Sequence, residues 1–264
     1  MTERQPERWN GFEKQTFLFE GKQAILVFPN RPDAQKNWLL KMEYWDAFPA
    51  REKELVERGF HLAYLQNETR FATRSDCERK ARFVEFLHRT YGLREKCVPV
   101  GLSCGGAHAV NFAGYYPEKT VCVYLDAPVL NFCSYPGKLG DAECERVWQT
   151  EFIKAYPGVE RHELLNFPDH PLNRIPRLQE YRIPVIMLYG TQDETVSYSE
   201  NGGLLELAYR KCPELLEAVA RNLQGHHPHG ELWQPERLIR WILAACGREA
   251  EQVCPNAESG GNAR

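Results

Sequence analysis

Short apolar runs alternate with longer amphipathic segments along most of this chain. A continuous apolar run of five or six residues is typical of a strand that is buried on both faces of a sheet. The runs that predict strands are residues 16–22, 24–29, 60–65, 98–102, 121–125 and 184–189.

Helices are expected between these strands. Segment 75–91 has Ser75 in the N-cap position, Glu78 three residues later and Gly92 as a stop signal. Helical patterns also cover residues 45–58, 107–116, 203–211 and 235–245. Strands that alternate with helices indicate a mainly parallel central sheet with helices on both faces, which is a three-layer α/β architecture.

Residues 131–180 interrupt this alternation. They are rich in prolines, aromatic residues and charges, and they show no clean period. We expect them to form a small, cap-like insertion over the carboxyl edge of the sheet, where ligands bind in open α/β sheets. Residues 1–246 then form one domain, and the tail 247–264, rich in Gly, Asn, Glu and Ala, is expected to be disordered.

Composition and charge exclude several classes of partner. The 264 residues suffice for one large α/β domain, and a net charge of −3 gives no footprint for binding nucleic acid. No apolar run approaches the roughly 20 residues needed to span a bilayer. The polar first residues lack a signal-peptide core, so we expect a cytoplasmic protein with no membrane partner.

Nine cysteines occur without a Cys-x-x-Cys pair, and several of them lie in apolar stretches. An odd number in such surroundings predicts buried reduced thiols rather than a disulfide framework or a zinc site.

The first chemical signal is the sequence Gly101-Leu102-Ser103-Cys104-Gly105. It joins an apolar strand to a helical segment, so the serine lies on a sharp turn where glycines leave room for a strained backbone. The N-terminus of the helix favours negative charge beside the hydroxyl. Acyl transfer needs such an exposed nucleophile and donors for an oxyanion, although ordinary glycine-rich turns show the same pattern.

A serine nucleophile needs a histidine base and an acid that orients it, and both can follow the serine along the chain. Asp193 lies in a Gly-x-x-Asp turn after the strand 184–189, and Asp126, at the end of another strand, is the alternative acid. The sequence Gly225-His226-His227-Pro228-His229 offers three candidate bases. In a parallel sheet all of these turns lie at the carboxyl edge.

These motifs, in this order, resemble the α/β-hydrolases of the esterase and lipase type, over roughly residues 14–246. The resemblance implies the α/β-hydrolase fold and carries over Ser103 as nucleophile, Asp193 as acid and His226 as base. His226 is favoured over the two later histidines because members of this family usually place the catalytic histidine directly after a glycine.

The resemblance also implies an oxyanion hole. The backbone N–H of Cys104, directly after the nucleophile, is its first donor. The second is expected from the loop after the first buried strand, where Asn30 or Arg31 is the candidate because the flanking prolines have no N–H. The Cys104 thiol is a rival nucleophile, but the side chain at this position usually points into the fold.

Substrate choice is expected to come from residues 131–180 and from Trp38, Lys41, Asp126 and His227. Trp38 could stack on a sugar ring and Lys41 could bind a carboxylate, although both could equally belong to a packed or solvated loop. Segment 36–44, together with the doubled histidine, resembles a group of bacterial hydrolases linked to sugar-ester hydrolysis.

We therefore expect a serine esterase that acts on a small-molecule ester, with a small or sugar-linked acyl group, and that needs no cofactor. A serine peptidase or amidase on the same fold is one alternative, and a non-catalytic scaffold that binds a ligand or partner is another. The clustered histidines also suggest a metal, but no carboxylate or cysteine lies at a familiar ligand spacing, so no metal is expected.

Overall fold

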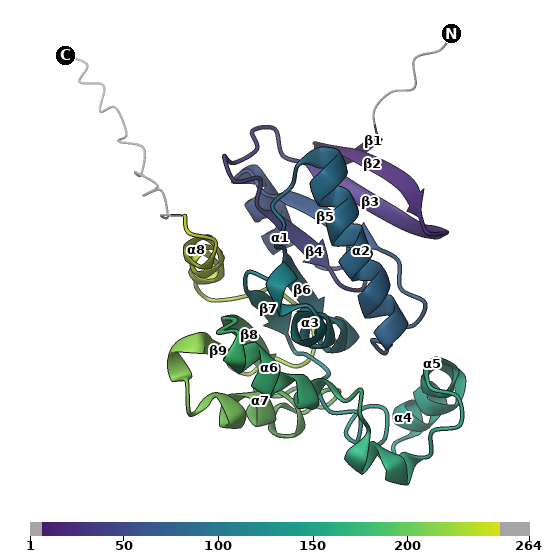
Figure 1. Ribbon diagram of the computed structural model, residues 1–264. Coiled ribbons are helices and arrows are strands. Elements are labelled where there is room, and N and C mark those ends of the chain that lie inside the picture. The colour runs from purple at the N-terminus through teal and green to yellow at the C-terminus, as the bar shows by residue number, and fades with distance from the viewer. Residues whose placement is uncertain (1–6, 249–264) are drawn as a thin grey trace, which may run out of the picture.

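The computed structural model describes residues 7–248, which are built around one β-sheet (Figure 1). These residues form a nine-stranded sheet in the order β1-β2-β3-β5-β4-β6-β7-β8-β9. The strands are β1 Glu7–Trp9, β2 Phe12–Phe19, β3 Lys22–Phe28, β4 Trp38–Lys41, β5 His61–Leu65, β6 Val98–Leu102, β7 Val123–Asp126, β8 Val185–Gly190 and β9 Leu216–Arg221.

Strand direction divides the sheet into two parts. From β5 across to β9 neighbouring strands are parallel, so all of them end at one edge, called here the carboxyl edge. Strands β1, β2 and β3 form an antiparallel meander, and β3 is also antiparallel to β5. The two-residue turn between β2 and β3 is Glu20-Gly21, with φ of 47° and 76°, as a type I′ hairpin requires.

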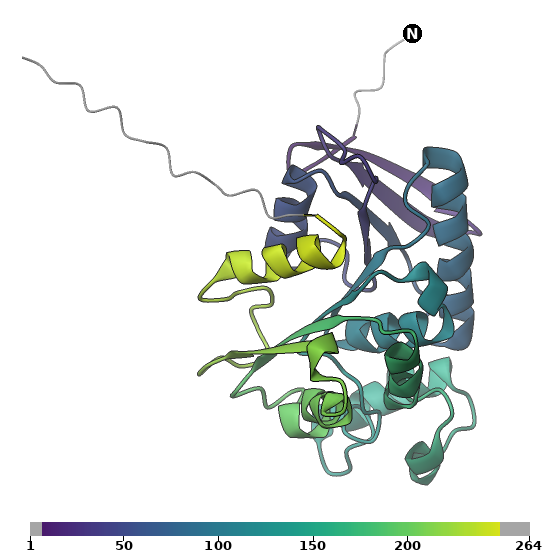
Figure 2. The same ribbon diagram turned by 60° about the vertical axis from the view of Figure 1, so that its left-hand side comes forward.

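Helices cover both faces of the sheet (Figure 2). Helices α1 and α8 pack together on one face, whereas α2, α3, α6 and α7 form a layer on the other. The bounds are α1 Ala50–Glu57, α2 Arg74–Tyr91, α3 Cys104–Tyr115, α4 Ala142–Val147, α5 Ile153–Ala155, α6 Ile175–Glu180, α7 Gly202–Tyr209 and α8 Pro235–Ala245. The mainly parallel, three-layer α/β architecture predicted from the sequence is thereby confirmed.

The sheet is buried on both faces because each helical layer has its own apolar core. In β3, Leu26 joins one core with Phe83 of α2 and Phe112 of α3, whereas its neighbour Ile25 joins another with Ile242 of α8. Successive side chains of a strand point to opposite faces. A strand between two helical layers must therefore be apolar at every position, which is why continuous runs predicted the strands.

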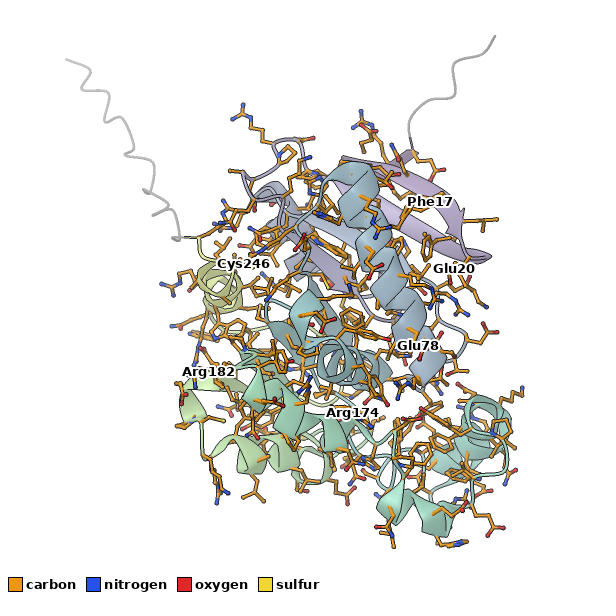
Figure 3. All side chains as sticks on the ribbon, viewed as in Figure 1. Phe17, Glu20, Glu78, Arg174, Arg182 and Cys246 are labelled. Atoms are coloured by element: carbon orange, nitrogen blue, oxygen red, sulfur yellow. The ribbon has the colours of Figure 1, made fainter. Side chains whose placement is uncertain are left out.

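Helix α2 also holds the antiparallel end of the sheet. Phe17 of β2 and Glu20 of the following turn lie beside this helix (Figure 3). The ring of Phe17 lies 5.8 Å from that of Phe86, and Glu20 accepts two hydrogen bonds of 2.7 Å from Arg82. The N-cap of α2 is Thr73, whose hydroxyl accepts from the Asp76 N–H, rather than the expected Ser75. Its end at Gly92, in the left-handed conformation, is as predicted.

Strand β4 was not predicted, and it corrects the role expected for two residues. Trp38 is fully buried in the core between the sheet and α2, where its indole donates a 2.9 Å hydrogen bond to the carbonyl of Arg94. Lys41 is 2% exposed and forms a buried ion pair with Glu52 of α1. The expectation that Trp38 and Lys41 bind substrate is therefore wrong, because segment 36–44 contains an inner strand.

The positions of Asn30 and Arg31 also differ from the expectation. Because β3 runs antiparallel to β5, the loop after β3 lies at the edge of the sheet opposite the carboxyl edge. This loop contacts the residues that precede β5, and the Asp33 N–H donates to the carbonyl of Gly59 at 3.1 Å. Neither Asn30 nor Arg31 can therefore serve an oxyanion hole beside Ser103.

Residues 131–180 form short helices and turns, including α4, α5 and α6, rather than strands. They pack on the start of α3 through a cluster of buried aromatic side chains, among them Phe71, Phe132, Phe152 and Tyr156. Most of the expected disordered tail, from residue 249 on, lies outside the described residues. Among the helices of residues 7–248, none is long and apolar enough to cross a membrane.

The buried position of Trp38 gives a prediction about stability. Trp38→Ala removes a large core side chain, so the free energy of unfolding should fall by about 3–5 kcal/mol in urea denaturation. Trp233→Ala is the matched control, since Trp233 is 98% exposed and its loss should change stability by less than about 0.5 kcal/mol. Equal, small effects of both substitutions would contradict the assignment of Trp38 to the core.

Candidate active site

Ser103 lies on the turn between β6 and α3 and has a strained backbone, with φ of 50° and ψ of −122°. The glycines around it are required by close packing. A Cβ on Gly101 would lie 2.5 Å from the carbonyl oxygen of Gly105, and a Cβ on Gly106 would lie 2.3 Å from the Cβ of Pro128. Strain of this kind, maintained by its surroundings, is typical of functional sites.

Hydrogen bonds from the neighbouring strand hold this turn in place. The Ser103 N–H donates to the carbonyl of Asp126 at 3.0 Å, and the Ser103 carbonyl accepts from the N–H groups of Val129 and Gly106, both at 2.9 Å. Cys104 is the first residue of α3, so its N–H has no acceptor within the helix.

Ser103, His226 and Asp193 form one chain of hydrogen bonds. The Oγ of Ser103 lies 3.0 Å from Nε2 of His226, and Nδ1 of the same imidazole lies 2.7 Å from Oδ2 of Asp193. The side chains of His226 and Asp193 are 9% and 1% exposed. The structure thus brings together the three residues that the sequence singled out for catalysis, although 123 positions separate Ser103 from His226.

Asp193 is itself fixed by the turn after β8. Its Oδ1 accepts hydrogen bonds from the N–H groups of Thr195 at 3.0 Å and Val196 at 2.8 Å, which leaves Oδ2 for His226. Gly190, the last residue of β8, lies against the histidine loop so closely that a Cβ there would be 2.2 Å from the carbonyl of Gly225. The acid and the base are therefore held at a fixed separation.

Two further histidines pack against His226. The ring centroids of His227 and His229 lie 4.7 Å and 5.0 Å from that of His226, in edge-on contacts, and His227 also stacks on Phe48. Burial is the main cause that lowers the pKa of His227 below its ordinary value, and repulsion from the other two imidazoles lowers it further. His227 is therefore neutral near pH 7 and forms an aromatic wall beside the base.

The same three histidines are the group best placed to hold a metal within residues 7–248, since one nitrogen from each lies within 4.8 Å of the others. The nitrogens of His226 are engaged with Ser103 and Asp193, and Nδ1 of His229 lies 3.2 Å from Asp126. A metal bound here would displace Ser103 from its base, so the arrangement suits acid–base chemistry better.

A cavity of about 280 Å³ opens onto Ser103. Aromatic side chains line much of it, including Tyr44, Phe48 and Tyr135, and Arg70 and Glu143 add charge. Tyr135 and Glu143 come from segment 131–180, which was expected to contribute to substrate choice. Arg70 is joined to Glu151 of the same segment through two contacts of 2.5 Å and 2.9 Å, which tie the segment to the cavity wall.

The loop after β4 borders this cavity and was not predicted from the sequence. Three non-glycine residues within it, Tyr44, Asp46 and Phe48, have positive φ values of 55°, 63° and 50°. Because a helix cannot contain these positive φ values, α1 begins at Ala50 rather than at residue 45, where the helical pattern begins. Because β4 is parallel to its neighbour β6, the loop after β4 lies at the carboxyl edge, next to Ser103.

Two other candidates have different surroundings from Ser103. The Cys104 side chain is buried, and burial raises the pKa of its thiol, so it is a protonated packing group and a poor nucleophile. Asp126 is fully buried and contacts Arg221, His229 and the Gly230 N–H rather than His226. Nδ1 of His226 thus donates to Asp193 and not to the alternative acid, and full burial leaves Asp126 without the contact with substrate that was expected.

No protein-family model matches this chain, and no curated protein does. Three of the solved structures that match it are each 14% identical to it. A puromycin-hydrolysing peptidase from Mycobacterium tuberculosis gives a TM-score of 0.71, covering 90% of this chain and 39% of the peptidase. Est1E from Butyrivibrio proteoclasticus gives a TM-score of 0.63, and the match covers 89% of this chain and 99% of Est1E. A dipeptidyl aminopeptidase IV-like protein from Bacteroides ovatus gives a TM-score of 0.65, and the match covers 90% of this chain and 36% of that protein.

The chain thus spans about two fifths of the length of these two peptidases and nearly all of Est1E. At this level of identity the likeness concerns the fold alone. The sheet order, the parallel strands and the serine turn at the carboxyl edge agree with it, and they show that this chain has the α/β-hydrolase fold.

Proposed function

We propose that this protein is a serine hydrolase that cleaves carboxylic esters of small acyl groups through an acyl-enzyme. The observation that carries the proposal is the continuous hydrogen-bond chain from Ser103 through His226 to Asp193, with distances of 3.0 Å and 2.7 Å. These contacts match the geometry that a nucleophile, a general base and an orienting acid require.

In the proposed mechanism, Oγ of Ser103 attacks the ester carbonyl carbon while Nε2 of His226 takes the hydroxyl proton. His226 then gives that proton to the departing alkoxide, and the acyl group remains on Ser103. Water, deprotonated by His226, then attacks the acyl carbon. The bond between the acyl group and Oγ of Ser103 breaks, His226 returns the proton to Oγ, and the acid is released. Asp193 keeps the imidazole in the tautomer with the proton on Nδ1 and stabilises the imidazolium.

Stabilisation of the oxyanion requires two backbone N–H donors. The first residue of α3, Cys104, offers an N–H at a helix N-terminus next to the nucleophile. For the second donor we propose a backbone N–H of residues 43–45, because this segment follows β4 and Tyr44 lines the cavity. This segment takes the place of Asn30 and Arg31, the candidates expected from the sequence for the second donor. Loss of one such donor typically costs about 3 kcal/mol of transition-state stabilisation.

The size of the cavity limits the acyl group. Its volume of about 280 Å³ lies at the lower end of small-molecule sites. The aromatic walls favour a flat or apolar group, and the charges of Arg70 and Glu143 suit a polar alcohol portion. Esters of short acids with polyhydroxylated alcohols, including acetylated sugars, fit these properties.

A peptidase or amidase activity is the second candidate. It is favoured by the likeness to two peptidase-type structures. The chain spans less than half of each of those proteins, however, and the small cavity leaves less space for a peptide than for a short acyl group. A non-catalytic scaffold would not need the strained Ser103 turn or the aligned histidine.

The role of Ser103 as nucleophile can be tested with a simple ester. The wild-type protein should hydrolyse p-nitrophenyl acetate, and Ser103→Ala should lower kcat by about 10⁴-fold or more, since the acyl-enzyme can no longer form. Release of p-nitrophenol at pH 7.5 measures both rates. Wild-type turnover no faster than that of the variant would exclude the proposed role of Ser103.

The histidines can be separated in the same assay. His226→Ala removes the base and should lower kcat by about 10³-fold or more. His227→Ala changes one cavity wall and should act mainly on KM, with kcat reduced less than about tenfold. Circular dichroism of each variant checks that the fold is retained. Equal losses of kcat in the two variants would contradict the assignment of His226 as the base.

Acyl length tests the proposed substrate class. Across p-nitrophenyl esters from acetate to decanoate, kcat/KM should be highest for the short acids and fall about tenfold or more once the chain outgrows the cavity. Acetylated sugars and the p-nitroanilide of the same short acid extend the series to alcohol and amide leaving groups. An anilide cleaved as fast as its ester would favour the amidase function instead.

A further inference from the structure

Asp126 ends β7 next to the nucleophile strand β6, and it is completely buried. Its Oδ1 lies 3.1 Å from Nη2 of Arg221 on β9 and 3.2 Å from Nδ1 of His229. Arg221 is buried as well, with 1% of its side chain exposed. A charged pair this deep costs desolvation energy, which the attraction between the two charges and their further polar contacts must offset.

The pair holds the loop that carries His226. The Gly230 N–H donates to Oδ2 of Asp126 at 2.5 Å, and Arg221 donates to the carbonyl of Pro228. With His229, the Asp126–Arg221 pair therefore contacts three consecutive residues of the loop. On the other side of Gly230, its carbonyl accepts a 2.9 Å hydrogen bond from Nε of Arg51.

Asp126 also holds the nucleophile turn, through its main chain. Its carbonyl accepts the Ser103 N–H at 3.0 Å, and the N–H of the next residue, Ala127, donates to Leu188 of β8 at 2.8 Å. One residue thus contacts the serine turn with its backbone and the histidine loop with its side chain. These contacts connect the serine turn to the loop that carries His226.

We propose that Asp126 is a positioning residue that, with Arg221, fixes the His226 imidazole against Ser103. The proposal rests on the proposed serine-hydrolase function and adds a second carboxylate to it. Asp193 orients the imidazole ring by a direct hydrogen bond, whereas Asp126 fixes the backbone from which that ring extends. Misplacement of a catalytic group by about 1 Å can cost about 100-fold in rate.

The test compares Asp126→Asn with the double variant Asp126→Asn/Arg221→Gln. The single variant leaves Arg221 buried without its counter-ion, so it should lose both stability and rate. The double variant removes both charges, which should recover much of the stability. The loop contacts of the pair remain weakened, so kcat per active site should stay about 10- to 100-fold below wild type, with KM changed less than about threefold.

Active sites are counted by the amplitude of a fluorophosphonate titration, so that unfolded protein does not enter kcat. Leu87→Ala, in the fully buried core of α2, is the control for stability alone, and its kcat per active site should match wild type. Recovery of kcat together with stability in the double variant would overturn the proposal, because Asp126 would then serve stability only.

A spectroscopic measurement separates this proposal from the proposed function. The proton between His226 Nδ1 and Asp193 should give a downfield ¹H resonance in ¹⁵N-histidine-labelled wild-type protein. We expect it to broaden or shift in the double variant and to stay unchanged in Leu87→Ala. An unchanged resonance in the double variant would count against positioning by Asp126, whereas an inactive wild-type protein with an intact resonance would count against the hydrolase function alone.

Discussion

The parallel direction of the strands from β5 to β9 is the constraint on which the rest of this structure depends. Parallel strands end at one edge of a sheet, so residues at the ends of β6, β7 and β8 meet there although they lie far apart in the chain. Ser103, Asp126 and Asp193 reach the site in this way. The loop after β9 adds His226, and the loop after β4 adds the strained backbone around Tyr44. Chemistry at this site therefore follows from the topology.

Bringing these groups together has an energetic cost that the fold offsets locally. The backbone of Ser103 is strained, and glycines on both sides make the turn sterically possible. Asp126 and Arg221 are buried charges that would be unfavourable alone, and each neutralises the charge of the other while it also contacts the histidine loop. Strain and buried charge are thus confined to the elements that set the distance between nucleophile and base, while the two apolar cores supply stability around them.

The sequence predicts the fold and the catalytic candidates for separate reasons. Strands buried on both faces are continuous apolar runs. Ser103 lies in a Gly-x-Ser-x-Gly turn, Asp193 follows a strand and His226 precedes the last helix, so all three positions are visible without any structure, and the resemblance to esterases and lipases implied their roles. The short strand β4 was missed because its four residues are preceded by a polar loop and end in Lys41, which looks exposed. Without β4, the loop after β3 was taken as the oxyanion loop, and Asn30 and Arg31 were the expected donors. Only the antiparallel pairing of β3 with β5 reveals that this loop lies at the opposite edge of the sheet.

The function proposed for this site depends on Ser103 being a nucleophile that His226 activates. Intact-mass spectrometry after incubation with a fluorophosphonate measures this property, because the reagent needs an activated serine but no matching substrate. We expect one adduct per molecule, mapped by peptide sequencing to Ser103 and formed at least about 100-fold more slowly in His226→Ala. A wild-type protein that remains unlabelled, or an adduct on another residue, would contradict it.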